Sequence, residues 1–393
     1  MSGLAHHLLK RGLDATHQNL YQGAVQSNDG DNHDRLKSIP AWGIITLWVT
    51  LLLFIFVHFV ITYTYGTIVA TLAIIETPTA TAFAVEPAES DETDAPLLSG
   101  DQKIPAPTSS PEPELFLIKT KPITSKIRTT VKHLRAQAGP WSRFRGLHVA
   151  IVYHLAYALL FNFFSSFSRS PLAQSLFAVA THTILSRLNM TWTHIVMSNP
   201  SPKSWYRRFP SLKSGSKVFL PTAIWAAAEQ LALYIPALMF GTYGLERYAE
   251  DPSHYRDVAP EVFASDVSQV FICALVALFI VFAIVFPAQV TLTRVQASML
   301  PEEDESIVPF DRSFGGRVEP AVVGGNGCVS MLDAWKTFDW AARIRLIKLY
   351  VKVIALQIFT TLIFIGVFVG EARLIMGDDF NKVVRKAHDG LRH

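Results

Sequence analysis

Hydrophobic residues gather in six long stretches, which polar and charged segments separate. The stretches cover approximately residues 43–75, 147–167, 172–197, 218–243, 267–290 and 346–369. Each has about 20 residues or more, the length that a helix needs to cross a bilayer. A soluble helix buries only one apolar stripe, whereas the run from Trp48 to Val60 presents apolar residues on every face. The pattern predicts an all-α fold, a polytopic integral membrane bundle of six transmembrane helices.

The composition agrees with a membrane domain. Hydrophobic residues make up 50% of the 393-residue chain and charged residues 17%, where soluble proteins have about 25% charged residues. No polar segment between the stretches is able to bury a core of its own. We therefore expect one membrane domain over residues 43–370, a polar N-terminal tail over 1–42 and a C-terminal tail over 371–393.

The first connection between predicted spans has two parts. Residues 76–118 are rich in Pro, Thr, Ser and acidic residues, which predicts a disordered loop and a place where a protein partner binds. Residues 119–146 are basic, and their apolar residues recur at helical spacing. Those residues are Ile123, Ile127, Val131 and Leu134. The spacing predicts a short amphipathic helix, either at the membrane interface or as a solvated linker.

The charge of the connections predicts the topology. The first, third and fifth connections are rich in Lys and Arg, the fourth is mostly acidic, and the second is a short turn. By the positive-inside rule, the odd connections face the cytosol or the mitochondrial matrix, and both termini face the other side. Residues 187–194 and 287–294 also align in position, about a hundred residues apart, which favours three pseudo-repeated hairpins.

Three short motifs resemble those of the mitochondrial solute carrier family. Residues 287–296 (PAQVTLTRVQ) are similar to the signature that closes the odd helices of that family, and residues 139–147 and 333–336 are similar to its matrix-helix motifs. The residues at the defining positions are Pro287, Gln289, Arg294, Gln296, Arg145 and Gly146. The resemblance spans most of the chain between the first and last stretches. It implies movement of a small solute or metabolite through a central cavity by alternating access.

The signature positions also depart from the family pattern. In the third repeat the acid position holds Gln289 and one base position holds Leu292, and the second repeat has Asn189 and Trp192 at the matching positions. The first stretch has no signature. A gate made of ion pairs therefore cannot form from these positions. Two interpretations remain open: a carrier with an altered gate, or a non-transporting structural or interaction protein of a mitochondrial membrane.

Polar residues inside the predicted spans are the candidate solute contacts. Glu229 and Gln230 lie in the fourth span, His154 in the second and Gln357 in the sixth. Ionisable groups are costly inside a bilayer and mark a pathway or a packed polar pair. A hydrogen bond between helices, or a protonated carboxyl, is the alternative for Glu229. In the carrier family the even helices contact the solute, so the resemblance implies that role for these residues.

No motif indicates an enzyme, a cofactor or a metal site. Cys273 and Cys328 form neither a Cys-x-x-Cys pair nor a Cys/His spacing, and a net charge of +3 is too small to indicate a nucleic-acid partner. The expected partners are membrane lipid, a small-molecule solute, and a protein that binds the 76–118 loop. The resemblance implies the mitochondrial inner membrane, with the outer membrane or a secretory-pathway membrane as alternatives.

Overall fold

The computed structural model describes residues 40–77, 80–85, 114–119, 121–250, 259–319, 324–325 and 327–377. These residues form two compact units. One contains the residues up to Thr50 and those from Gly366 onward, and the other contains Leu51–Ile365. Most of the predicted tails and of the 76–118 loop lies outside the described residues, so the disorder of that loop stays a prediction.

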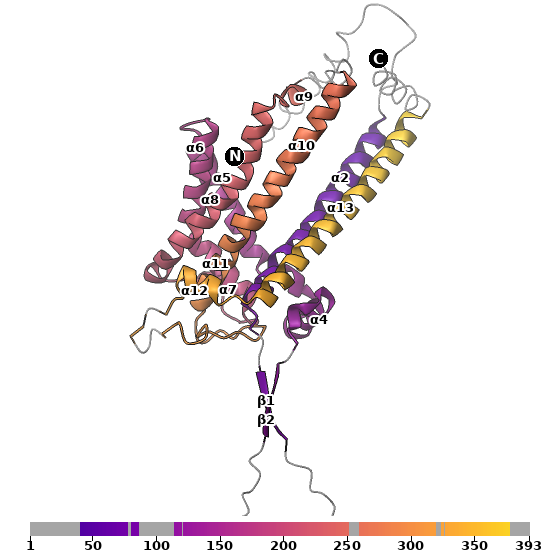
Figure 1. The fold of residues 1–393 in the computed structure, drawn as a ribbon. Helices are drawn as coiled ribbons and strands as arrows, with labels where there is room; N and C mark the ends of the chain where they lie inside the picture. The colour runs from indigo at the N-terminus through magenta and orange to yellow at the C-terminus, as the bar shows by residue number, and fades with distance from the viewer. Residues whose placement is uncertain are drawn as a thin grey trace, which may run out of the picture. The chain divides into compact units, whose positions relative to one another are not determined.

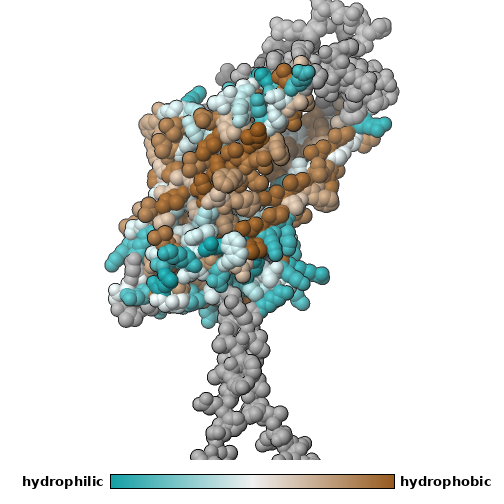
Figure 2. All heavy atoms as spheres, viewed as in Figure 1, coloured by the Kyte–Doolittle hydropathy of each residue, from teal (hydrophilic) through white to brown (hydrophobic). Residues whose placement is uncertain are grey.

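Five helical segments of the described residues are long and apolar enough to cross a membrane. Large hydrophobic side chains cover their outer surface (Figure 2), for example Leu159 at 66% exposure and Phe279 at 69%. Such exposure is costly in water and favourable in lipid. The prediction of a helical membrane protein is therefore confirmed at this level.

The helical segments contain interruptions that divide them into shorter helices (Figure 1). The first segment consists of α2 (Ala41–Ile61), the π-helix η1 (Thr62–Val69) and α3 (Ala70–Ile75). The second is the 3-10 helix η3 (Pro140–Phe144) followed by α5 (Leu147–Ser165), and the third is α8 (Leu212–Thr242). The fourth consists of α10 (Pro260–Ile280), the π-helix η6 (Val281–Val285) and α11 (Phe286–Ser298), and the fifth is α13 (Trp340–Met376).

The predicted third span is not one continuous helix. Residues 172–197 belong to α6 (Pro171–Ile184) and α7 (Ser186–Met197), and the chain leaves helical geometry at Leu185, with φ −84° and ψ 7°. Beyond the break, the side chain of Arg187 donates to the Pro210 carbonyl at 2.6 Å, so α7 begins among polar groups. Six continuous spans are therefore not confirmed, because the apolar pattern continues through a break in the backbone.

Within the unit Leu51–Ile365, four of the long helices pack as neighbours (Figure 1). Helix α6 packs against both α5 and α8, and α8 packs against α10. Helices α2 and α13 are joined by polar contacts within the same unit: Gln357 Nε2 donates to Thr62 Oγ1 at 2.9 Å, and Thr361 Oγ1 lies 3.2 Å from His58 Nε2. In the other unit, the Thr50 hydroxyl donates to the Glu371 carboxylate.

Short helices and loops form what we call the base of this unit. It contains α3, α4 (Ile127–Ala138), α7, α11 and α12 (Met331–Lys336), together with the 3-10 helices η2 (Ile123–Ser125) and η4 (Trp205–Arg208). The predicted basic helix is α4, and its apolar face packs onto the base, where Leu134 is fully buried. Hydrophilic residues gather at this end of the helices (Figure 2).

Two further elements connect these helices. Strands β1 (Ala80–Val85) and β2 (Glu114–Lys119) pair antiparallel, with Ala80 opposite Lys119 and Val85 opposite Glu114. The sequence pattern does not predict this pair. Helix α9 (Arg247–Glu250) is a single turn after α8, and the Arg247 side chain there forms an ion pair with Asp266 near the start of α10.

Candidate functional site

Three short helices meet at the base: α3, α7 and α11 pack on one another. Each follows an interruption, which is η1 before α3, Leu185 before α7, and η6 before α11. Pro287 is the second residue of α11 and lacks the N–H group that a continuous helix would use. Its predicted role as a kink agrees with the π-helix directly before it. Interruptions of this kind are frequent at functional sites.

Arg294 on α11 links two of these chain segments. Its guanidinium is buried and donates to the Ile74 carbonyl of α3 at 3.1 Å and to the Thr337 hydroxyl at 3.0 Å. The cation also lies over the rings of Phe314 and Phe338, 4.8 and 5.4 Å from their centroids. A buried cation needs hydrogen bonds from several directions. The Ile74 carbonyl thus accepts the hydrogen bond from Arg294, whereas in an ion-pair gate a carboxylate would be the acceptor.

Helix α7 is joined to α11 in the same manner. His194 Nε2 donates to the Gln296 carbonyl at 2.8 Å, and the Thr193 hydroxyl donates to the Gln296 side-chain oxygen at 2.7 Å. Both Gln296 and His194 are buried. Gln289, at the expected acid position, is only partly buried and takes no part in these contacts. The prediction that no ion-pair gate forms from the signature positions agrees with this junction.

The motif residues Arg145 and Gly146 also lie at the base. Arg145 Nε donates to the Ile195 carbonyl at the end of α7 at 2.7 Å, and the Tyr63 hydroxyl donates to the Arg145 carbonyl at 2.7 Å. Gly146 has φ +72°, and a Cβ atom there would lie 3.1 Å from Trp192 Cδ1. Glycine is therefore required for both conformation and space.

The base also contains a buried ion pair and a pocket lined by acidic residues. Arg208 forms a buried ion pair with Asp304 at 2.9 Å. Near Arg294, a pocket of about 300 Å³ is lined in part by Asp311 and Asp339. Burial alone would raise the pKa of Asp311, but hydrogen bonds from Ser313 and Gly315 and the charge of Arg294 hold it below its usual value.

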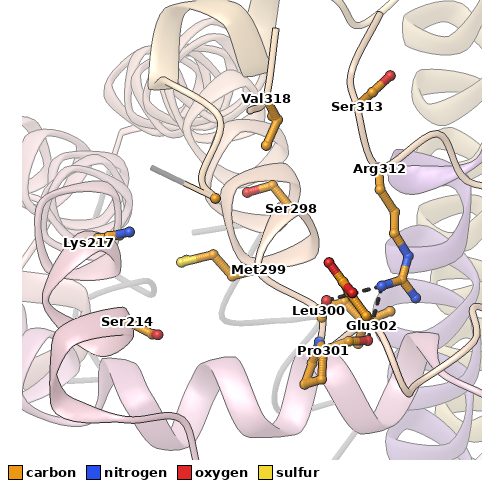
Figure 3. Close-up of a pocket in the computed structure, with 11 residues that line it drawn as sticks. Ser214, Lys217, Ser298, Met299, Leu300, Pro301, Glu302, Arg312, Ser313 and Val318 are labelled. Carbon is orange, nitrogen blue, oxygen red and sulfur yellow. Dashed lines mark hydrogen bonds between the residues drawn. The ribbon is translucent and has the colours of Figure 1, made fainter. Parts of the chain in front are cut away.

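Two larger pockets open at the base. The first, of about 680 Å³, lies between the start of α8, the end of α11 and the loop that follows (Figure 3). Its Arg312 guanidinium donates to the Leu300 and Pro301 carbonyls at 3.2 and 3.0 Å, which fixes that loop. The second, of about 330 Å³, lies between η2 and α13. Its basic residues are Lys121, Arg345, Lys348 and Lys352.

The four predicted solute contacts lie in two places. Glu229 and Gln230 are partly buried on α8, and His154 on α5 is exposed next to Tyr153, with ring centroids 5.4 Å apart. Gln357 bonds Thr62 on the α2–α13 pair. The pockets described above are lined by other residues. The role of the four predicted residues as solute contacts therefore stays a prediction. Gln357 already has a hydrogen-bond partner within the protein.

Trp225, one helical turn before Glu229 on α8, belongs to a set of rings that contact one another. We call them the aromatic cluster, which consists of Tyr63, Tyr153, Tyr157, His182, Trp192 and Trp225. The Tyr153 hydroxyl lies 2.6 Å from His182 Nδ1, and the His182 ring lies 5.2 Å from Trp225, edge to face. The helical spacing of Tyr153 and Tyr157, and of Trp225 and Glu229, is the sequence signal for this cluster.

Neither a protein-family model, nor a curated protein, nor a solved structure matches this chain. The site is therefore interpreted from its own geometry. It combines one carboxylate in a helix long and apolar enough to cross a membrane, a set of rings contributed by five helical segments, and a base in which three short helices are hydrogen-bonded together. The described residues contain no group of three side chains suited to bind a metal ion.

Proposed function

We propose that the chain transports a small solute across a membrane, with the aromatic cluster and Glu229 as its binding site. The observation that carries the proposal is the position of Glu229. A carboxylate in an apolar helix is costly, and no described residue forms a hydrogen bond or an ion pair with it. Such groups in membrane helices mark pathways. Interrupted helices next to a polar site are also how many transporters are built.

The proposal includes the topology and location that the sequence predicts. We propose that α6 and α7 together form the third crossing, so that six crossings form three hairpins with the base on the positively charged side. Alternating access would then require α3, α7 and α11 to separate at the base. The mitochondrial inner membrane is the proposed location. Protease protection of both tagged ends in isolated organelles tests topology and location together.

Membrane lipid is the proposed second partner. Lys121, Arg345, Lys348 and Lys352 line one pocket beside the apolar part of α13, where basic residues meet lipid head groups. Arg345 is also close to Glu76, with 3.8 Å between its Nη2 and the carboxylate oxygen. The Glu76 carboxylate in turn accepts the Thr124 N–H at 3.1 Å.

Transport is tested by reconstitution. Purified full-length protein in liposomes should exchange labelled solutes of at least one class, and Glu229→Gln should reduce that exchange at least tenfold, on the order of the 1.4 kcal/mol that one charged contact contributes. A matched change, Glu371→Gln, replaces a carboxylate that bonds Thr50 and should leave exchange unaltered. Absence of exchange of every solute class by folded protein would reject the proposal.

A second function is favoured by the base itself. Arg294, which is buried, and Arg145, which is partly buried, donate to main-chain carbonyls and not to the carboxylates of an ion-pair gate. A non-transporting interaction protein would keep this base closed and bind its partner through the 76–118 loop. In that case deletion of residues 86–113 should abolish partner capture, whereas Glu229→Gln should have no effect.

A further inference from the structure

The substrate class of the proposed site follows from the charge around Glu229. No described Lys or Arg forms an ion pair with its carboxylate, and the basic residues of the same helix, Lys213 and Lys217, lie in its first two turns. Lys217 is twelve residues before Glu229, which corresponds to about 18 Å along the helix axis. The carboxylate therefore lacks a protein cation that would compensate its charge within the apolar surroundings.

Rings occupy the space next to this carboxylate. Trp225 lies one helical turn before Glu229 and so shares its face of α8, and the Trp225 Nε1–H group is buried without a hydrogen-bond partner. The His182 ring of α6 meets Trp225 edge to face, with centroids 5.2 Å apart, and His182 Nδ1 lies 2.6 Å from the Tyr153 hydroxyl of α5. Ring faces carry negative potential and attract cations. The carboxylate and the rings that neighbour it therefore both favour a cation over an anion.

We propose that Glu229 and the aromatic cluster bind a small organic cation, an ammonium compound with apolar substituents. A metal ion fits less well, because Ca²⁺ and Mg²⁺ require several oxygen ligands and the described residues offer no cluster of metal-binding side chains. An anionic solute would meet the uncompensated charge of Glu229. An organic ammonium compensates that charge and places its alkyl groups against the rings. This inference rests on the proposed function in one respect, namely that the cation bound at this site is the solute that the protein transports.

Binding is measured without transport. Full-length protein in nanodiscs of zwitterionic lipid is titrated with radiolabelled tetraethylammonium, and n-butylammonium and butanoate serve as competitors of equal size and opposite charge. We expect saturable binding that butylammonium displaces and butanoate does not. Glu229→Gln should weaken binding at least about tenfold, and Trp225→Leu about threefold to tenfold, the range of one cation–π contact. Glu371→Gln is the matched control and should leave affinity unchanged, and circular dichroism confirms that each variant is folded.

Several results would overturn the inference. They are absence of saturable binding to folded protein, equal affinity of the wild type and Glu229→Gln, and equal competition by butanoate. If Glu229→Gln alters only the pH dependence of transport and no cation binds, the site holds a proton and the inference is wrong. Cation binding without uptake in liposomes would reject the transport function alone. Uptake of anions without cation binding would reject the substrate class alone.

Discussion

Replacement of Arg294 tests whether its hydrogen bonds hold the base together. Arg294→Met removes the bonds to the Ile74 carbonyl and the Thr337 hydroxyl, and both ring contacts. It also removes the desolvation cost of a buried cation, which is several kcal/mol. The Thr337 hydroxyl keeps its bond to the Asp333 carbonyl at 2.6 Å. The remaining cost is the unpaired carbonyl of Ile74, so we expect a loss of about 1–3 kcal/mol in the free energy of unfolding.

Arg294→Lys should be more destabilising than Arg294→Met, although it keeps the charge. An ammonium group lacks the planar fork that serves the Ile74 and Thr337 acceptors together, and it leaves a buried cation with fewer bonds. Loss of a partner from a buried charge costs about 3–5 kcal/mol. Equilibrium unfolding in mixed detergent, followed by circular dichroism, compares both variants with the wild type.

A surface arginine provides the control. Arg317 is 50% exposed and pairs with Asp333, so Arg317→Lys should change the free energy of unfolding by less than about 1 kcal/mol. If Arg294→Lys is as stable as the wild type, or more stable than Arg294→Met, then the geometry of the guanidinium is not what joins α3 to α11, and the account of the base given above is wrong.

Three further predictions use the same unfolding measurement. Gly215→Ala should cost about 1–3 kcal/mol by overpacking, because a Cβ there would lie 2.5 Å from Arg187 Cγ; a neutral result would mean that this side chain moves freely. Gln357→Leu should cost about 0.6 kcal/mol, the usual strength of a bond between membrane helices, through loss of its Thr62 contact; a cost above about 2 kcal/mol would contradict that estimate. The hydrogen bond from Ser330 and the ion pair with Arg317 hold the pKa of Asp333 below its usual value of 3.8. The contribution of Asp333 to the free energy of unfolding is therefore complete above about pH 4 and is lost as the pH falls further. Asp333→Asn should remove that part of the acid sensitivity, and an unchanged pH profile would refute it.

The long spans were predictable because hydropathy reflects the membrane directly, but the helix ends were not. The sixth stretch was expected at 346–369, whereas α13 covers Trp340–Met376. Arg343 and Glu371 are charged, so they end the apolar stretch, but charged residues do not interrupt a helix. The helix therefore continues beyond the apolar stretch at both ends. The same holds for α8, which begins at Leu212 with Ser211 as its cap, six residues before the expected start at 218. Hydropathy predicts depth in the membrane, and capping decides where a helix begins.

The break at Leu185 was not predictable from one sequence, and the aromatic cluster was predictable only in part, through helical spacing within α5 and α8. No Pro or Gly marks Leu185, and the bond from Arg187 to Pro210 that accompanies the break joins segments whose proximity depends on tertiary packing. Glu229 was found because a carboxylate is conspicuous in an apolar run. His182 and Trp225 stand out less in the sequence, because aromatic residues are ordinary members of membrane helices until their contacts are known.

The base differs from an ion-pair gate in one respect that sequence comparison alone would miss. Three of its acceptors are main-chain atoms, namely the carbonyls of Ile74, Ile195 and Gln296, and they act beside side-chain acceptors such as the Thr337 hydroxyl. Substitution at Ile74 or Ile195 leaves those carbonyls in place, whereas substitution of Arg145, His194 or Arg294 removes a donor. Part of the junction is therefore independent of side-chain identity on the acceptor side. It follows that variants on the donor side should weaken the junction, while conservative changes at Ile74 or Ile195 should act only through packing.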